Sequence, residues 1–551
     1  MRSRLRWLLS VISFIGGCAY SISGATPSVQ AAQTIVVRKG FSTESIEIAD
    51  LRQLAETGTA PSSLRSFARN LSSQQRSQIL SALRAKFDID VLQVSRLLDT
   101  EIGSAIASAL ASTTSRQDNV GVLDVRSGLV LGARAPEGLS LLSFIEAYPR
   151  QTLYIDLNRA FKVVENFNSA FWQTQWFMAE IAPQLTVKRP QLNLPFDPTL
   201  PGTASVQVLN LKLNDTQRRR EIPVDVYWSE AASPAKPIIV LSHGLGSVRT
   251  DMRYLAEHLA SYGYVVAALE HPGSNESHVK QVVRGKAPLL DAQEFLDRPK
   301  DISFVIDELE KLNQKAGELQ GKLAPDRVMV IGYSLGGSTA LSIAGAELQL
   351  ASLKERCKGN VISFNLGEAS QCFASGLPED RYQLRDPRVK AAIAFNPTTS
   401  LLFGETGLSA VQVPTLIEAA SADKTTPALT EQIIGFSQIP APKWLVGVVG
   451  GTHLSVKDPS TTQDQARQPN TLYTGGEVVG EQAVAIRSYM KAIALAMAAQ
   501  LTDDAAKSAI FLTPEYAQLA STDAFPIRLV TEIPPKAQAV VDDFLQNQSK
   551  R

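Results

Sequence analysis

The hydrophobic positions divide the chain into a helical first part and a second part in which apolar runs alternate with amphipathic stretches. In the first part, Ile79, Leu80 and Leu83 form one face of a helix, and comparable spacing continues toward residue 165. In the second part, the runs have the length and the flanking turns of strands. The division predicted from this pattern is an all-helical domain over residues 33–185, a proline-rich linker over 186–201, an α/β domain over 202–505 and a C-terminal extension over 506–551.

The second part predicts a doubly wound sheet. Alternating apolar and polar positions over 204–213 and 221–228 predict an antiparallel hairpin. Further apolar runs, most of them separated by helical stretches, follow at 237–242, 264–269, 327–331, 389–395, 414–419 and 444–449. This alternation is typical of the α/β class, in which helices cover both faces of a mostly parallel sheet.

The first 32 residues have the pattern of an export signal. Arg2, Arg4 and Arg6 precede an apolar segment, Trp7–Cys18, that is too short to span a bilayer. We expect residues 1–32 to be removed and the protein to be secreted or periplasmic. Processing at Cys18 as a lipoprotein and an uncleaved membrane anchor are the alternatives.

Two cysteines remain once the export signal is removed. Because exported proteins meet an oxidising compartment, Cys357 and Cys372 predict a disulfide. The pair lies in an insertion over residues 349–386. Two interpretations stay open for this insertion: it forms a lid or a wall of a substrate pocket, or it is a surface loop that needs a covalent clip.

The segment Gly332–Gly336 has the pattern of a nucleophile elbow. Its sequence, Gly-Tyr-Ser-Leu-Gly, follows the apolar run Val328–Ile331 and precedes a helix of small residues. A serine on a sharp turn between strand and helix requires neighbours that nearly lack side chains, which the glycines supply. The pattern predicts Ser334 as a nucleophile.

Chain order selects the partner base. A serine nucleophile needs a histidine to take its proton, and in this motif the order along the chain is serine, acid, histidine. His453 is the one histidine that follows Ser334, and it lies in a loop at the end of an apolar run. The other four histidines precede the serine: His243, His258, His271 and His278.

The acid is predicted at Asp423, in the loop that follows the apolar run at 414–419. From such a loop, a carboxylate can hold the tautomer of the histidine. The alternatives are Glu418, inside the same run, and a simple helix-capping role for Asp423. Asp380 and Asp386 are charged loop residues with nothing special about their setting.

Two backbone amides are predicted to form an oxyanion hole. Leu335 follows the nucleophile and supplies one N–H. Leu245 supplies the other, because the segment His243–Gly246 has the sequence His-Gly-Leu-Gly directly after an apolar strand. Since the hydrogen bonds come from the backbone, His243 is predicted to organise the loop and not to act as a base.

Together these motifs make residues 200 to 500 resemble the α/β-hydrolases. The resemblance is to the branch that holds platelet-activating factor acetylhydrolases, dienelactone hydrolase-like proteins and secreted polyester hydrolases. The acetylhydrolases carry their acid after the strand that follows the nucleophile helix, where this chain has Asn396. The acid therefore looks shifted to Asp423, as in the polyester hydrolases. Dienelactone hydrolases use a cysteine nucleophile, and Ser334 argues against their chemistry.

Residues 33 to 185 resemble an uncharacterised helical domain found ahead of cyanobacterial α/β-hydrolases. The likeness rests on the segment Arg134–Leu142 and on the pair Tyr148 and Pro149. An aromatic cluster near Trp172 and Trp176 follows at helical spacing. Packing of this helix against the catalytic domain is one interpretation, and contact with the acyl pocket or a membrane surface is the other.

The combined expectation is an exported serine hydrolase of carboxylic esters, acting without a cofactor or metal on small-molecule, lipid or polymeric substrates. The 54 basic and 54 acidic residues balance, so no charge excess indicates nucleic acid as a partner. An acyltransferase with the same three residues and a non-catalytic binding protein on a hydrolase scaffold are the alternative functions.

Overall fold

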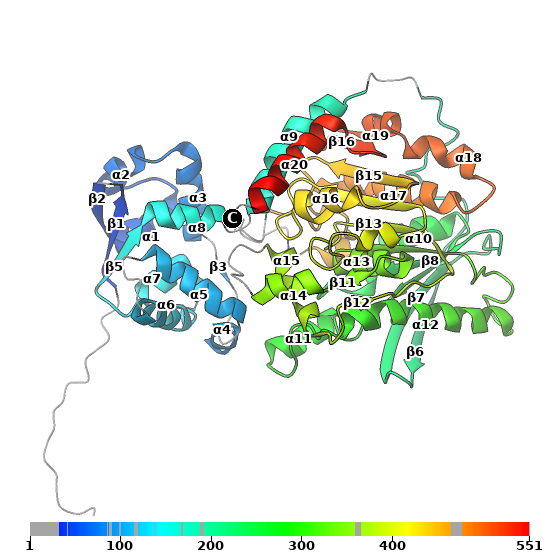
Figure 1. The fold of residues 1–551 in the computed structure, drawn as a ribbon, viewed down its shortest axis with the longest axis horizontal. Helices are drawn as coiled ribbons and strands as arrows, with labels where there is room; N and C mark the ends of the chain where they lie inside the picture. Colours follow the sequence, from blue (N-terminus) through cyan, green and yellow to red (C-terminus); the bar gives the residue numbers. More distant parts are fainter. Residues whose placement is uncertain are drawn as a thin grey trace, which may run out of the picture.

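The computed structural model describes residues 32–549 with the exception of 41, 85, 88–90, 99–100, 115–118, 137, 167–168, 188–191, 359–364, 464 and 466–475. The segment 1–31, with Cys18 and nearly all of the expected export signal, lies outside the described residues. No helix of the described part is both long enough and apolar enough to cross a membrane. The described residues form two lobes, the N-terminal lobe over residues 32–166 and the large lobe over residues 169–549 (Figure 1).

A mostly parallel sheet runs through the large lobe. Among the described residues it has nine strands, in the spatial order β16-β15-β14-β13-β10-β8-β9-β7-β6 (Figure 1). The six central strands are parallel to one another, namely β9, β8, β10, β13, β14 and β15, whereas β6, β7 and β16 join antiparallel. Their bounds are β6 Gln207–Asp215, β7 Arg220–Trp228, β8 Ile238–Ser242, β9 Val265–Leu269, β10 Val328–Tyr333, β13 Val389–Phe395, β14 Thr415–Ala420, β15 Lys443–Val448 and β16 Ile527–Val530.

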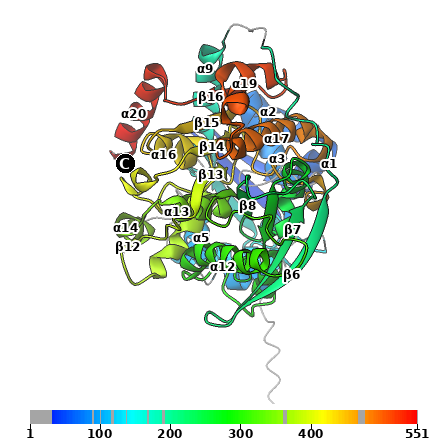
Figure 2. The same ribbon diagram turned by 90° about the vertical axis from the view of Figure 1, so that its right-hand side faces the viewer.

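Helices cover both faces of this sheet. Because side chains alternate along a strand, Ile238 and Val240 enter one hydrophobic core and Ile239 and Leu241 enter the other. The first core contains α12 (Glu294–Gln314) and α13 (Leu335–Ala344), and the second contains α10 (Arg253–Ser261) and α17 (Val484–Ala499). Figure 2 shows α13 and α17 on opposite sides of the strands. The predicted doubly wound sheet is confirmed.

The N-terminal lobe is not all-helical, so that prediction was wrong. Strand β1 (Thr34–Lys39) lies between β2 (Ser42–Glu47) and β5 (Thr152–Asp156), antiparallel to the first and parallel to the second. The β-branched run at the start of β1 favours a strand, but its parallel partner lies more than 100 residues away along the chain. Helical periodicity shows only local order and misses such pairing. The helices of this lobe are α1 Ile48–Thr57, α2 Arg65–Arg69, α3 Ser73–Arg84, α4 Val91–Leu98, α5 Glu101–Thr113, α6 Asn119–Gly132, α7 Leu141–Glu146 and α8 Leu157–Asn166.

Helix α9 (Ser169–Ile181) belongs to the large lobe, although its sequence falls within the predicted helical domain. Phe177, Met178 and Ile181 enter the same hydrophobic core as the nucleophile helix. Its Thr174 hydroxyl accepts the N–H of Leu429 at 3.0 Å. Packing is therefore the role shown for this helix. The indole side chains of Trp172 and Trp176, on which the expected membrane contact rests, lie outside the described part of the structure.

The C-terminal extension completes the large lobe. It supplies strand β16 to the edge of the sheet and the helices α18 (Ala505–Ser508), α19 (Pro514–Ala520) and α20 (Pro535–Ser549). The Arg528 guanidinium of β16 donates to the carbonyl of Ala182 at 2.8 Å, just beyond the end of α9. The boundary predicted at residue 505 therefore separates parts of one packed body.

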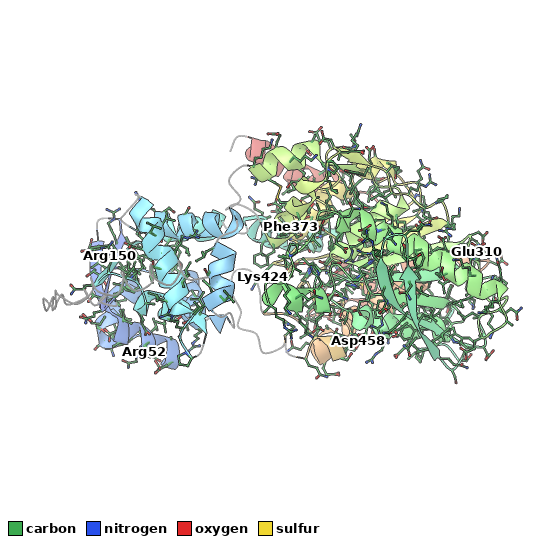
Figure 3. The ribbon with its side chains drawn as sticks, turned by 90° about the horizontal axis from the view of Figure 1, so that it is seen from below. Arg52, Arg150, Glu310, Phe373, Lys424 and Asp458 are labelled. Carbon is green, nitrogen blue, oxygen red and sulfur yellow. A yellow bond between two sulfur atoms is a disulfide. The ribbon has the colours of Figure 1, made fainter. Side chains whose placement is uncertain are left out.

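The insertion over 349–386 forms a small subdomain on the large lobe. It contains α14 (Ala351–Lys358), α15 (Leu366–Gln371) and the paired strands β11 (Leu348–Gln349) and β12 (Arg381–Tyr382). The predicted disulfide between Cys357 and Cys372 is present, with 5.6 Å between the Cα atoms. The N–H of Gly367 donates to the carbonyl of Thr425 at 2.7 Å, so the insertion supports the loop that carries Asp423. Figure 3 labels Phe373 of the insertion and Lys424 of this loop.

Candidate active site

Ser334 occupies a strained turn between β10 and α13. Its backbone angles, φ of 55° and ψ of −122°, lie in a region that residues other than glycine rarely adopt. The surrounding glycines are required by space, since a Cβ on Gly332 would lie 1.9 Å from the Gly336 carbonyl oxygen. The N–H of Ser334 donates to the carbonyl of Phe395 on β13 at 2.9 Å. These contacts hold the serine side chain at the carboxyl edge of the sheet.

His453, in the loop after β15, reaches Ser334, and Asp423, in the loop after β14, reaches His453. The Nε2 atom of His453 lies 3.1 Å from the Ser334 Oγ, and its Nδ1 lies 2.6 Å from the Asp423 Oδ2. All three side chains are buried or nearly so. An ionised Asp423 requires Nδ1 to carry the proton, which leaves Nε2 free to accept the serine proton.

The Asp423 carboxylate is held by its own loop, Ser421–Pro427. Its Oδ1 accepts the backbone N–H groups of Thr425 and Thr426 at 2.8 and 2.7 Å. Its Oδ2 accepts the Thr426 hydroxyl at 2.7 Å in addition to His453. Four donors therefore converge on the two oxygens and fix the carboxylate plane.

The loop that carries His453 is anchored to its surroundings. The carbonyl of Gly451 accepts the N–H of Ala422 at 2.8 Å, and the Glu477 carboxylate accepts the N–H of Leu454 at 3.1 Å. The ring of Tyr333 lies 5.1 Å from the imidazole of His453, centroid to centroid. These contacts fix the imidazole between the serine and the aspartate.

Glu418, the alternative acid, occupies a different environment. It lies within β14 and is fully buried, and no hydrogen bond joins it to His453 in the described structure. Burial, followed by the nearby charge of Asp423, raises the pKa of the Glu418 carboxyl to about 8. The group is therefore mostly protonated at neutral pH.

The other carboxylates considered from the sequence lie in separate ion pairs. Asp380 pairs with Lys354, and Asp386 pairs with Arg388. Asn396 uses its side-chain oxygen to accept the N–H of Ala420 at 3.1 Å, so it supports the end of β14.

The two predicted oxyanion donors lie on segments that contact Ser334. Leu335 is the first residue of α13, and the first N–H groups of a helix have no partner within it. A Cβ on Gly244 would lie 3.2 Å from the Ser334 Cβ, so the segment His243–Gly246 packs directly against the nucleophile. Leu245 is the next residue of that segment.

His243 organises this segment. Its Nε2 accepts the N–H of His271 at 2.9 Å, and its Nδ1 lies 2.7 Å from the carbonyl oxygen of Gly244. With Nε2 as acceptor, Nδ1 must be the donor. Burial, reinforced by the charge of Arg298, lowers the pKa of His243 well below its ordinary value, so the imidazole is neutral.

Sequence reasoning missed a buried polar network beneath the same segment. His271 joins Ser242 at 3.0 Å and Asp301 at 2.9 Å, and the guanidinium of Arg298 lies against Ser242. A signal for the network was present in the sequence of α12. Glu294, Arg298 and Asp301 recur at the spacing of one helix stripe, which is otherwise continued by apolar residues.

Two family models match separate parts of the chain. The model described as an alpha/beta hydrolase of unknown function matches residues 31–156, and the model described as platelet-activating factor acetylhydrolase, isoform II, matches residues 199–294. The first of these matched segments falls in the N-terminal lobe, and the second contains the segment His243–Gly246.

Curated relatives match the large lobe at low identity. The platelet-activating factor acetylhydrolase of Canis lupus familiaris is 30% identical over 141 residues, which cover 19% of this chain and 31% of the relative. The same enzyme of Cavia porcellus is 30% identical over 155 residues, covering 22% of this chain and 35% of the relative. The chain thus spans about a third of the length of the curated relatives it matches. With the sheet topology, these matches support an α/β-hydrolase of the branch that includes those enzymes.

Proposed function

We propose that this α/β-hydrolase is an exported serine esterase whose substrates are lipid esters. The observation that carries the proposal is the continuous series of hydrogen-bond distances from Ser334 through His453 to Asp423, at the carboxyl edge of the sheet. The named activity of the matched relatives supports ester chemistry and favours a lipid ester as the substrate class.

In the first half-reaction, the Ser334 oxygen attacks the ester carbonyl carbon while His453 Nε2 takes the hydroxyl proton. Asp423 stabilises the imidazolium that forms. The amides of Leu245 and Leu335 donate to the oxyanion of the tetrahedral intermediate. When the intermediate collapses, the carbon–oxygen bond to the alcohol breaks and His453 gives its proton to the departing oxygen, which leaves an acyl-serine.

In the second half-reaction, water takes the place of the alcohol. His453 removes a proton from the water as its oxygen attacks the acyl carbon, and the same two amides stabilise the second oxyanion. Collapse breaks the bond to Ser334 Oγ, which recovers its proton from His453. The products are a carboxylic acid and the free enzyme, so the cycle balances without another reactant.

Export is part of the proposal. The basic and apolar pattern of residues 1–32 supports it, and so does the disulfide between Cys357 and Cys372, which is typical of oxidising compartments. Fractionation of the native host tests this point: the mature protein is expected outside the cytoplasm with an N-terminus near residue 33, and a cytoplasmic protein that keeps residue 1 contradicts it.

A panel of p-nitrophenyl esters of rising acyl length, hydrolysed by residues 33–551, tests the activity. We expect hydrolysis by the wild type, none above background by Ser334→Ala, and labelling of the wild type alone by a fluorophosphonate probe. The chain length that gives the highest kcat/KM reports the acyl preference. Equal labelling of wild type and Ser334→Ala contradicts the proposed function.

A further inference from the structure

A buried arginine joins the two segments that carry the proposed oxyanion donors. Arg298 lies on α12, and only 1% of its surface is exposed. Its guanidinium contacts the segment His243–Gly246 on one side and α13 on the other. These two segments supply the amides of Leu245 and Leu335.

On the first side, Arg298 holds the segment at both ends. Its Nη2 donates to the carbonyl of His243 and lies 3.3 Å from the Ser242 hydroxyl. Its Nη1 donates to the Ser274 hydroxyl at 2.7 Å, and the Ser274 carbonyl accepts the N–H of Gly246 at 2.8 Å. The backbone that carries Leu245 is therefore fixed before and after that residue.

The orientation of the Leu245 amide follows from this anchoring. The Gly244 carbonyl and the Leu245 N–H belong to one planar peptide group and point in opposite directions. The His243 imidazole binds that carbonyl at 2.7 Å. The His243 ring therefore sets the direction of the Leu245 N–H, and Arg298 fixes His243 by binding its backbone carbonyl.

On the second side, the contact passes through Thr339. The Nε of Arg298 donates to the Thr339 hydroxyl at 3.1 Å, and that hydroxyl donates to the Leu335 carbonyl at 2.9 Å. Leu335 is the first residue of α13 and carries the second proposed donor. One guanidinium therefore sets the relative position of both amides.

The charge of Arg298 is also unusual. Its hydrogen-bond partners are the neutral oxygens named above, and no carboxylate lies within ion-pair distance of it in the described structure. The nearby carboxylates bind other arginines: Asp301 pairs with Arg218 and Arg220, and Glu294 pairs with Arg220. Burial lowers the pKa of Arg298 to about 10, so the group stays cationic at neutral pH. The carboxylates of Glu294 and Asp301 act on Arg298 through space and favour its charged form, and a cation behind an oxyanion hole favours negative charge there.

We propose that Arg298 is a positioning residue that holds the Leu245 and Leu335 amides in register and adds positive potential behind them. The inference rests on the proposed function and goes beyond it, because it assigns a role in stabilising the oxyanion to a side chain that does not touch the substrate.

Three variants test this role. Arg298→Met removes the charge and the hydrogen bonds to both segments, and Arg298→Lys keeps the charge. Thr339→Val breaks only the link to Leu335. Arg388→Met is the matched control, because Arg388 is a partly buried arginine whose ion pairs with Asp386 and Asp307 lie outside the site. The readouts are kcat and KM on p-nitrophenyl butyrate, inhibition by an alkyl boronic acid that forms a tetrahedral adduct on the serine, and far-ultraviolet circular dichroism.

Loss of oxyanion alignment is expected to lower kcat and leave KM nearly unchanged, because the oxyanion exists only in the transition state and intermediates. For Arg298→Met we expect kcat to fall about tenfold to a hundredfold, with a parallel rise in the boronate inhibition constant. Arg298→Lys is expected to recover part of the loss, and Thr339→Val is expected to lose about threefold to tenfold. Arg388→Met is expected to keep both kcat and boronate affinity.

The possible failures are distinguishable. If the wild type is inert toward every ester and the fluorophosphonate probe, the proposed function fails and this inference fails with it. If the wild type is active while the Arg298 and Thr339 variants keep its kcat and boronate affinity, the Arg298 role alone is overturned. Where Arg298→Met does not fold, Arg298→Lys and Thr339→Val decide by the same measurements.

Discussion

Replacement of Asp423 by asparagine tests the proposed acid by exchanging one carboxylate oxygen for an NH₂ group. In the structure, Oδ1 of Asp423 accepts two backbone N–H groups, and Oδ2 accepts the hydroxyl of Thr426 and Nδ1 of His453. The asparagine amide has only one oxygen. If the NH₂ group faced the backbone, it would meet the N–H groups of Thr425 and Thr426, which are also donors. Each group left without a partner would cost about 1–3 kcal/mol. The oxygen therefore stays on the backbone, and the NH₂ group faces His453.

This orientation reverses the histidine tautomer. Nδ1 of His453 must then accept a hydrogen bond, so the ring proton moves to Nε2 and points at Ser334. A protonated Nε2 cannot take the serine proton. The expected loss in kcat is about 10⁴-fold, equivalent to about 5 kcal/mol of transition-state stabilisation, while KM changes little.

The assay is the initial rate of p-nitrophenyl butyrate hydrolysis, normalised to folded protein by circular dichroism. Glu418→Gln and Asp386→Asn are the matched controls, because they change the other acids considered from the sequence by the same single group. We expect both to keep kcat within about fivefold of the wild type. If Asp423→Asn keeps about a tenth of wild-type kcat or more, or if Glu418→Gln loses as much as predicted for Asp423→Asn, the assignment of the acid is refuted.

Three further predictions concern stability. In Gly336→Ala, the new Cβ would lie 2.0 Å from the Ser242 carbonyl oxygen, so we expect a loss of about 3 kcal/mol or more and a lower Tm; an unchanged melting curve contradicts the steric argument. The double variant Cys357→Ser and Cys372→Ser opens a crosslink between positions 15 residues apart and is expected to lose about 3 kcal/mol in urea unfolding; equal midpoints for reduced and oxidised wild type contradict this. Burial raises the pKa of Glu418 to about 8 from 4.5. Between these two pH values the folded state holds a proton that the unfolded state releases. The free energy of unfolding of the wild type therefore falls as pH rises, by up to about 1.4 kcal/mol per pH unit. The stability of Glu418→Gln relative to the wild type is therefore expected to increase from pH 5 to pH 8 and level off above; parallel stability curves contradict it.

The sequence predicted the parts of the site whose constraints are local or follow from chain order. The elbow is encoded by the glycines around Ser334, each required by a contact within a few residues or with the adjacent strand. His453 was selected because the other histidines precede the serine, and the structure places it at hydrogen-bond distance from Ser334. The short apolar runs predicted most strands of the large sheet, since a strand buried on both faces has a continuous apolar pattern.

The sequence did not show what depends on distant pairing or on buried charge. Strand β1 needs β5, more than 100 residues away, and periodicity carries no trace of that contact. Arg298 lies on the apolar stripe of α12, but this position alone does not predict a buried charge, because charged side chains are seldom buried. Packing of α9 against the catalytic domain was one of the two interpretations of its aromatic cluster and is confirmed. The domain boundary was nevertheless placed after this helix, because an amphipathic stripe does not show to which lobe a helix belongs.

The docking of α9 constrains how this protein could have been assembled from modules. The proline-rich stretch at 186–201 looks like the junction of a fusion, yet a helix encoded before it fills the core beside β15, where a Cβ on Gly447 would lie 2.9 Å from the Met178 Cε. Recombination at that stretch would separate the sheet from α9, which fills part of the hydrophobic core on one of its faces. An exchange of the N-terminal lobe that keeps this core intact therefore needs a junction upstream of residue 169, ahead of α9.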